Sequence, residues 1–168
     1  VDVTNSCGTE TDSVWVSILT AQIWAGSDTT VCPGQAAGLW ASGALYYEWY
    51  PGPAGSSSNG AMVSVVPPTN TTYLVVGTDA QGCQDSANVQ VNVFAAAYVN
   101  AGADVYAVQG DIIQLNALTS GPGSVVWAPD DEVSCVNCLS TQVSPSQNAL
   151  YTVYFTDQNG CTAESQVN

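Results

Sequence analysis

Carboxylates are the only charged side chains of this 168-residue chain, which has 14 Asp and Glu but no Lys, Arg or His. Mechanisms that need a His base, a Lys Schiff base or an Arg clamp are therefore excluded. A formal net charge of −14 also excludes nucleic-acid binding and polybasic attachment to anionic lipid, because both require cations. The remaining chemistries are carboxylate catalysis, metal binding through oxygen, or none.

Four aspartates stand in predicted turns or at junctions where calcium could bind. Calcium prefers oxygen ligands, and a bound ion would offset the repulsion among uncompensated carboxylates. The EF-hand pattern is absent, and aspartate is common in turns because it bonds to nearby backbone. Calcium is therefore a hypothesis and we expect no other cofactor; the candidate ligands are Asp28, Asp79, Asp104 and Asp157.

A single acidic cluster, Asp130, Asp131 and Glu132, could in principle supply the paired carboxylates of a glycoside hydrolase. It falls in a predicted loop, and nothing else in the sequence indicates a cleft with positioned groups. We interpret the cluster as a solvated loop and predict that the chain is not an enzyme.

Six cysteines without histidine favour disulfides over zinc, and hence an oxidising, extracytoplasmic compartment. Cys32 and Cys83 stand near the second and last predicted strands of one repeat, so we expect them to form a bridge. Closing that 51-residue interval would contribute up to ~4 kcal/mol in the chain-entropy model.

The pair Cys135 and Cys138 has Cys-x-x-Cys spacing, but a redox motif needs a thioredoxin-like context and zinc needs a second pair. We therefore expect a local Cys135–Cys138 bridge. Cys7 is expected to pair outside the segment. For Cys161 the sequence leaves a free thiol, a bond to Cys135 or Cys138, or a bond to a neighbouring chain open.

The chain repeats itself, with a spacing that indicates tandem domains. Residues 25–28 (Ala-Gly-Ser-Asp) match 101–104 (Ala-Gly-Ala-Asp) at a spacing of 76, and residues 78–83 (Thr-Asp-Ala-Gln-Gly-Cys) match 156–161 (Thr-Asp-Gln-Asn-Gly-Cys) at a spacing of 78. The two extra residues fall between the second predicted strand and a tryptophan. We predict that residues 1–20 are the C-terminal strands of a preceding repeat and that 21–95 and 96–168 are two further repeats.

Each repeat consists of short predicted strands separated by turns, with no sustained helical period. Residues 89–93 alternate apolar and polar, and the glycines of 79–82 and 157–160 suit hairpin turns. The pattern predicts an all-β fold of tandem immunoglobulin-like β-sandwich repeats with almost no helix. Buried core positions are expected at Trp49, Trp127, Tyr73 and Tyr151, whereas an outward aromatic platform for sugar is the alternative for Trp15, Trp24 and Trp40.

Several runs together resemble the Ig-like or PKD-like repeat of large cell-surface proteins of Bacteroidota, including gliding-motility adhesins of the SprB type. These runs are residues 31–34 (Val-Cys-Pro-Gly), 47–51 (Tyr-Glu-Trp-Tyr-Pro), 68–73 (Pro-Thr-Asn-Thr-Thr-Tyr) and 78–83. Residues 133–138 and 159–161 resemble a second version of that repeat. The resemblance implies type IX export, and O-glycosylation of the Asp-Ser/Thr triplets at Ser13, Thr29 and Ser86.

The composition, the repeats and the resemblance together predict a non-catalytic, extracellular structural segment of a cell-surface stalk or filament. We expect this segment to be cross-linked by disulfides and glycosylated. The alternative is an adhesive module that recognises polysaccharide or a surface. Expected partners are other copies or repeats of the same protein and surface polysaccharide. We expect no nucleic acid, and no membrane insertion because no apolar run approaches 18 residues.

Overall fold

The computed structural model describes residues 2–18, 20–51 and 60–168, and the regular elements of these residues are all β-strands. The predicted all-β, immunoglobulin-like sandwich fold is confirmed. The described residues contain no helix long and apolar enough to cross a membrane. The chain divides into two compact units, of which the first comprises Val1–Gly26, Leu39–Val63 and Tyr73–Asn88, and the second Ser27–Gly38, Ser64–Thr72 and Val89–Asn168.

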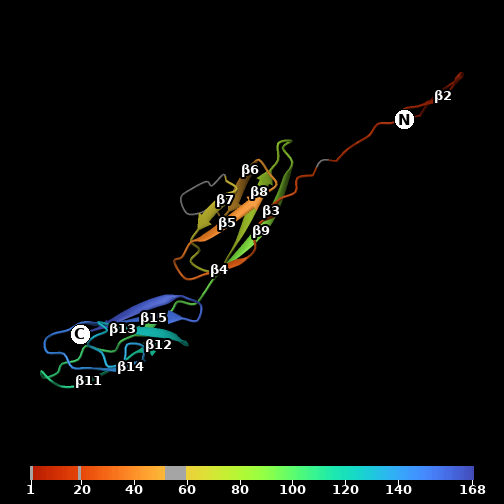
Figure 1. Cartoon of the computed structure of the whole chain (residues 1–168). Helices are drawn as coiled ribbons and strands as arrows, with labels where there is room; N and C mark the ends of the chain where they lie inside the picture. Colours follow the sequence, from red (N-terminus) through yellow and green to blue (C-terminus); the bar gives the residue numbers. More distant parts are fainter. Residues whose placement is uncertain (1, 19, 52–59) are drawn as a thin grey trace. The chain divides into compact units, whose positions relative to one another are not determined.

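The strands between residues 24 and 93 form two sheets (Figure 1). The three-stranded sheet has the order β3 (Trp24–Ala25), β5 (Ala37–Ser42), β7 (Met62–Val65). The four-stranded sheet has the order β4 (Thr29–Val31), β9 (Gln84–Val93), β8 (Thr71–Thr78), β6 (Tyr46–Tyr50). β4 pairs with β9 in parallel, whereas β6 and β8 are antiparallel.

Strict alternation of side chains gives these strands one buried and one exposed face. In β5 and β6 every second residue is buried, as expected where one face of a sheet packs on a core and the other meets solvent. Leu39 and Trp49 point into the core from the two sheets and are almost completely buried. The prediction that Trp49 belongs to the core is confirmed.

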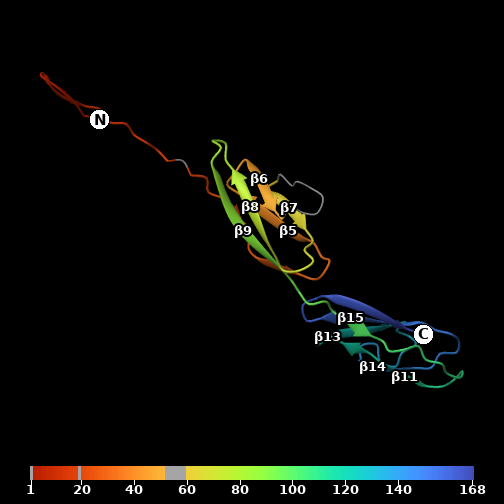
Figure 2. The ribbon, with the colours of Figure 1, turned by 180° about the vertical axis from the view of Figure 1, so that it is seen from behind.

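The strands after residue 98 repeat this arrangement in shorter pieces (Figure 2). Two antiparallel pairs join β10 (Val99–Asn100) to β12 (Leu118–Thr119) and β11 (Ile113–Asn116) to β14 (Ser140–Val143). The third sheet has the order β13 (Gly123–Ala128), β15 (Tyr151–Asp157), β16 (Thr162–Val167). A spacing of 76 before the turn at 120–122 and 78 after it relates these strands to those of the first repeat.

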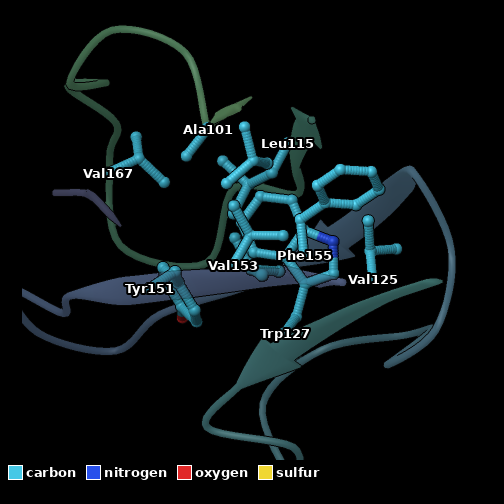
Figure 3. Close-up of a cluster of buried hydrophobic side chains, with 10 residues drawn as sticks. Ala101, Leu115, Val125, Trp127, Tyr151, Val153, Phe155 and Val167 are labelled. Carbon is cyan, nitrogen blue, oxygen red and sulfur yellow. The ribbon is translucent and has the colours of Figure 1, made fainter. Parts of the chain in front are cut away.

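Trp127 anchors the core of the second repeat (Figure 3). Its side chain is 0% exposed and lies among Leu115, Val125, Val153 and Phe155. The indole nitrogen donates a hydrogen bond of 3.0 Å to a carbonyl eleven residues further on. Trp49 makes the same bond, at 3.1 Å, to the carbonyl of the residue eleven positions after it. The two repeats therefore share hydrogen-bonded core positions as well as sequence.

The N-terminal residues form a separate hairpin. β1 (Asp2–Asn5) and β2 (Gly8–Thr11) are antiparallel, and the hydroxyls of Thr4 and Thr9 lie 2.9 Å apart across the ladder. Residues 12–18 follow without regular structure and are exposed.

Candidate functional site

The structure contains two disulfides, and one of them corrects the sequence expectation. Cys135 bonds to Cys138, the local pairing that the spacing favours. Cys32, which follows β4, bonds to Cys161, which precedes β16, with Cα atoms 5.5 Å apart. The expected Cys32–Cys83 bridge is therefore wrong. A bridge within one repeat would close a shorter interval, but the structure brings together two cysteines separated by 129 positions.

Asp79 and Asp157 organise two matching hairpin turns. Oδ1 of Asp79 accepts backbone N–H bonds of 2.9 Å from Gln81 and Cys83. Oδ1 of Asp157 accepts the corresponding bonds, 2.8 Å from Asn159 and 2.9 Å from Cys161. A carboxylate that accepts two backbone donors is an Asx-type turn, which explains both aspartates without a metal.

Asp28 and Asp104 also form a matched pair, and each ties the start of its repeat to the last strand. Oδ1 of Asp28 accepts from the backbone N–H of Gln90 at 2.8 Å, and Oδ1 of Asp104 accepts from that of Asn168 at 3.0 Å. No group of three or more Asp, Glu, Cys or His side chains in the described part of the chain is placed to hold a metal ion. The four calcium candidates therefore do not come together in one site.

Asp85 is a structural carboxylate that the sequence had not distinguished. Its Oδ2 accepts the backbone N–H of Ile23 at 2.9 Å. This bond and a second backbone bond from Ser86 lower the pKa of Asp85 below its usual value. The carboxylate therefore joins β9 to the chain just before β3.

The acidic loop at Asp130, Asp131 and Glu132 is exposed and makes no catalytic pair. Oε2 of Glu132 accepts a hydrogen bond of 3.0 Å from the hydroxyl of Tyr151. Burial of that phenol, together with the hydrogen bond and the negative charge of Glu132, raises the pKa of Tyr151 to about 12. Burial also raises the pKa of Tyr73 at the matching position. Both tyrosines are core residues, as predicted.

The three candidate glycosylation positions differ in their surroundings. Ser13 is exposed in the segment after β2, and Ser86 is exposed on β9. Thr29 is half-buried at the start of β4. An enzyme or a glycan could reach the two serines directly, whereas Thr29 offers less room.

Trp24, Trp40 and Met62 form an exposed surface on one side of the sheet β3-β5-β7, which we call the tryptophan face. Their side chains are 60%, 48% and 78% exposed. Trp24 lies directly opposite Ser42 on β5, and Trp40 precedes Ser42 by two residues on the same face. Trp15, the third aromatic candidate, is 95% exposed in the segment before the sandwich and is not part of this face.

Gly26 is a site residue that sequence reasoning missed. A Cβ at Gly26 would lie 2.8 Å from Nε1, 3.0 Å from Cδ1 and 3.2 Å from Cε2 of Trp40. These three atoms belong to the five-membered ring, so the indole of Trp40 lies across the backbone of Gly26. A glycine one strand away from a tryptophan is too weak a sequence signal to have indicated this contact.

The second repeat has a cavity of about 370 Å³, at the edge where β16 ends. Its lining includes Val105, Ile113, Leu115, Tyr151 and Val167. In the first repeat the corresponding edge is the parallel pairing of Thr29–Val31 with residues 91–93 of β9. The cavity thus lies along a strand edge of the sandwich. The residues that line it include no group of side chains arranged for catalysis.

Comparison with known proteins agrees with an immunoglobulin-like class. Residues 20–96 match the family model described as an Ig-like domain, CHU_C associated. An Ig-like domain of this type is therefore present in the first repeat. No curated protein matches the chain.

The chain is also similar to solved structures at low identity. Hemolin, an insect immune protein, is 12% identical over 90% of this chain and 48% of its own, with a TM-score of 0.44. DIP-gamma Ig1+Ig2 is 11% identical over 89% of this chain and 96% of its own, with a TM-score of 0.42. A Ca²⁺-stabilised, ice-binding adhesin of an Antarctic bacterium is 10% identical over 99% of this chain and 54% of its own, with a TM-score of 0.38. The chain spans about half the length of the hemolin chain it matches, and likenesses at this level say nothing about function.

Proposed function

We propose that this chain is a non-catalytic, structural segment of an extracellular stalk or filament, built from repeated immunoglobulin-like sandwiches. The observation that carries the proposal is the reuse of one set of structural bonds in two consecutive repeats. The tryptophan bond to the carbonyl eleven residues on recurs, and so does the aspartate turn at the last hairpin. Tandem reuse of one structural unit is typical of proteins that extend or display.

The charged groups support a structural role rather than catalysis. Asp28, Asp79, Asp85, Asp104 and Asp157 all accept hydrogen bonds from backbone N–H groups. A carboxylate used in this way positions the backbone, because one of its oxygens is engaged by backbone donors. These five carboxylates therefore act in the turns and junctions of the chain itself.

The two disulfides and the match of residues 20–96 point to an extracellular or surface protein. We further propose the finer organisation: residues 1–20 complete a preceding repeat, 21–95 and 96–168 are full repeats, and export follows the type IX route of Bacteroidota. Ser13, Thr29 and Ser86 remain the proposed O-glycosylation sites, and other copies or repeats of the protein the proposed partners. The absence of Lys and Arg removes every site for trypsin-like proteases, which suits a long-lived surface structure.

Electron microscopy of the native material tests the structural role. Ordered filaments whose axial repeat equals one sandwich, or one pair, support a structural polymer. Flexible single strings radiating from cells support a long stalk. A dispersed, soluble protein without either form contradicts the proposal, as would rapid digestion of the intact material by trypsin.

A second candidate is an adhesive module that recognises polysaccharide. The observation that favours it is the tryptophan face, because soluble proteins seldom leave two indoles exposed side by side on one sheet without a use. A glycan array separates the two candidates, since a segment with only a structural role should bind no glycan.

A further inference from the structure

The tryptophan face is not required by the sandwich fold, because the second repeat builds the same face without it. At the matched spacings, Trp24 corresponds to Asn100, Trp40 to Asn116 and Met62 to Ser140. The strand registers agree, since Trp24 pairs with Ser42 and Asn100 with Leu118, again at a spacing of 76.

In the second repeat the three matched positions carry polar side chains, and Leu118, opposite Asn100, is 67% exposed beside them. The hydroxyl of Ser140 donates to Oδ1 of Asn116 at 2.6 Å, and Nε2 of Gln114 donates to that hydroxyl at 2.7 Å. A hydrogen-bonded polar surface of this kind is what solvent favours on the outer face of a sheet. Two tryptophans and a methionine in the sister repeat thus expose apolar area that folding alone does not explain.

The indole of Trp40 is held flat by a close approach of the backbone. Its five-membered ring covers Gly26, where a Cβ would come within 2.8 Å of Nε1. Gly26 does not have a positive φ, so close approach, not backbone conformation, is what favours glycine there. The corresponding Gly102 has φ +97° and open space around it. One side of the Trp40 ring therefore rests on the sheet, and the other side faces solvent.

Trp24 extends this surface along the sheet. Diagonal neighbours on adjacent antiparallel strands have Cα atoms about 7–8 Å apart, which places the two indoles in reach of successive units of one polymer. Ser42, directly opposite Trp24, offers a hydroxyl that can donate or accept a hydrogen bond. The result is a flat aromatic surface with a polar group beside it.

The charge of the chain and the area of the tryptophan face indicate which class of ligand this face would bind. A chain with a net charge of −14 and no cationic side chain repels anionic polymers, and the three uncharged side chains of the tryptophan face offer a cationic polymer no partner. Three exposed side chains offer far less than the roughly 800 Å² per partner that a stable protein interface buries, which disfavours a second copy at this face. A pyranose ring whose hydroxyls are equatorial presents a flat C–H face that matches the size and polarity of an indole ring.

We propose that the tryptophan face of the first repeat binds a neutral polysaccharide with flat pyranose faces, of the β-1,4-linked glucan type. Trp40, seated on Gly26, stacks on one sugar ring and Trp24 on a neighbouring ring, while the sugar hydroxyls remain at the hydrated edge. This inference rests on the second candidate function, the adhesive module, and names the class of its ligand; the structural role would stand without it.

The test is a titration of the whole chain with a soluble β-1,4-glucan hexasaccharide. Calorimetry and tryptophan fluorescence measure the binding. We expect saturable binding that weakens at least tenfold in Trp40→Ala and in Trp24→Ala, because each variant removes one stacking surface. Trp15→Ala is the matched control, since Trp15 is an exposed indole outside the face, and it should bind as the unmodified chain does. An α-1,4-linked hexasaccharide, whose helical chain does not present a flat row of rings, should bind more weakly.

Gly26→Ala tests whether binding depends on the position of the Trp40 indole against Gly26, without removing an aromatic group. A methyl at this position must displace the indole of Trp40, so we expect a loss of affinity at unchanged tryptophan content. Circular dichroism and the unfolding midpoint establish that each variant is folded. No saturable binding at millimolar sugar, equal loss in Trp15→Ala, or a face whose substitution changes only self-association would each overturn the proposal. None of these results would affect the test of the structural role by microscopy.

Discussion

Replacing Asp157 separates a structural turn from a calcium site. Asp157→Ala removes an acceptor that binds two backbone N–H groups, at 2.8 Å from Asn159 and 2.9 Å from Cys161. A hydrogen bond to a charged group contributes about 1.5–3 kcal/mol, and the half-exposed position of this carboxylate reduces that to about 1 kcal/mol for each bond. We therefore expect Asp157→Ala to lower the free energy of unfolding by about 2 kcal/mol.

The amide variant provides the control. Asp157→Asn retains an oxygen that can accept both bonds and loses only the charge, so it should cost about 0.5 kcal/mol. Asp79→Ala, which breaks the matching turn of the first repeat, should behave as Asp157→Ala does because its two bonds have the same geometry. Urea unfolding, followed by circular dichroism and by tryptophan fluorescence, measures all three variants.

Calcium makes a different prediction for the same variants. An ion bound at a hundredfold excess over its dissociation constant would add about 2.7 kcal/mol to the stability of the unmodified chain. We expect the unfolding midpoint to be the same in millimolar calcium and in chelator. A calcium-dependent midpoint that Asp157→Asn abolishes, together with equal losses in the Asn and Ala variants, would refute the assignment of Asp157 to the turn.

Three further variants test other contacts. Because the pKa of Asp85 is lowered in the folded state, its contribution to stability is present above the unfolded-state pKa near 3.8 and is lost as the pH falls through the folded-state pKa. The melting temperature of Asp85→Asn should therefore fall less between pH 5 and pH 2 than that of the unmodified chain. Parallel plots of melting temperature against pH would contradict this. The pKa of Tyr151 is raised to about 12, chiefly by burial, so its contribution is present below pH 10.0 and is lost as the pH rises through 12; Tyr151→Phe should reduce alkaline unfolding in that window, seen by circular dichroism, and an unchanged alkaline profile would contradict this. Trp127→Phe leaves the carbonyl of Cys138 without its donor and opens a gap in the core. It should cost about 2–3 kcal/mol in urea unfolding, mainly through the gap; a loss below about 1 kcal/mol would show that the core collapses around the smaller ring.

Local patterns predicted much of the fold correctly. The Asp-x-x-Gly hairpin turns were found from sequence because the turn aspartate bonds only to residues two and four positions further on. The burial of Trp49 and Trp127 followed from their place in alternating strands within a repeat. Such features depend on neighbours a few residues away, and these neighbours are visible in the sequence.

The candidate site was only partly predictable. The sequence indicates an outward position of Trp24 and Trp40 only as an alternative, and their position on one face depends on the pairing of β3 with β5. The contact of the Trp40 indole with Gly26 depends on the same strand pairing and on the rotamer of the Trp40 side chain. Met62 joined the surface because β7 lies on the other side of β5, which no periodicity in the sequence indicates.

The sequence by itself determined the composition that excludes most catalysis, the repeat and the all-β class, because these depend on residue types and on spacing along the chain. Only the tertiary structure decided the partner of Cys32 and the assembly of the tryptophan face. A disulfide requires Cα atoms about 5.5 Å apart, and Cys161 meets that condition from 129 positions away. Which distant residues meet is set by the packing of whole strands, since local patterns show which side of a strand is buried but not which strand lies beside it.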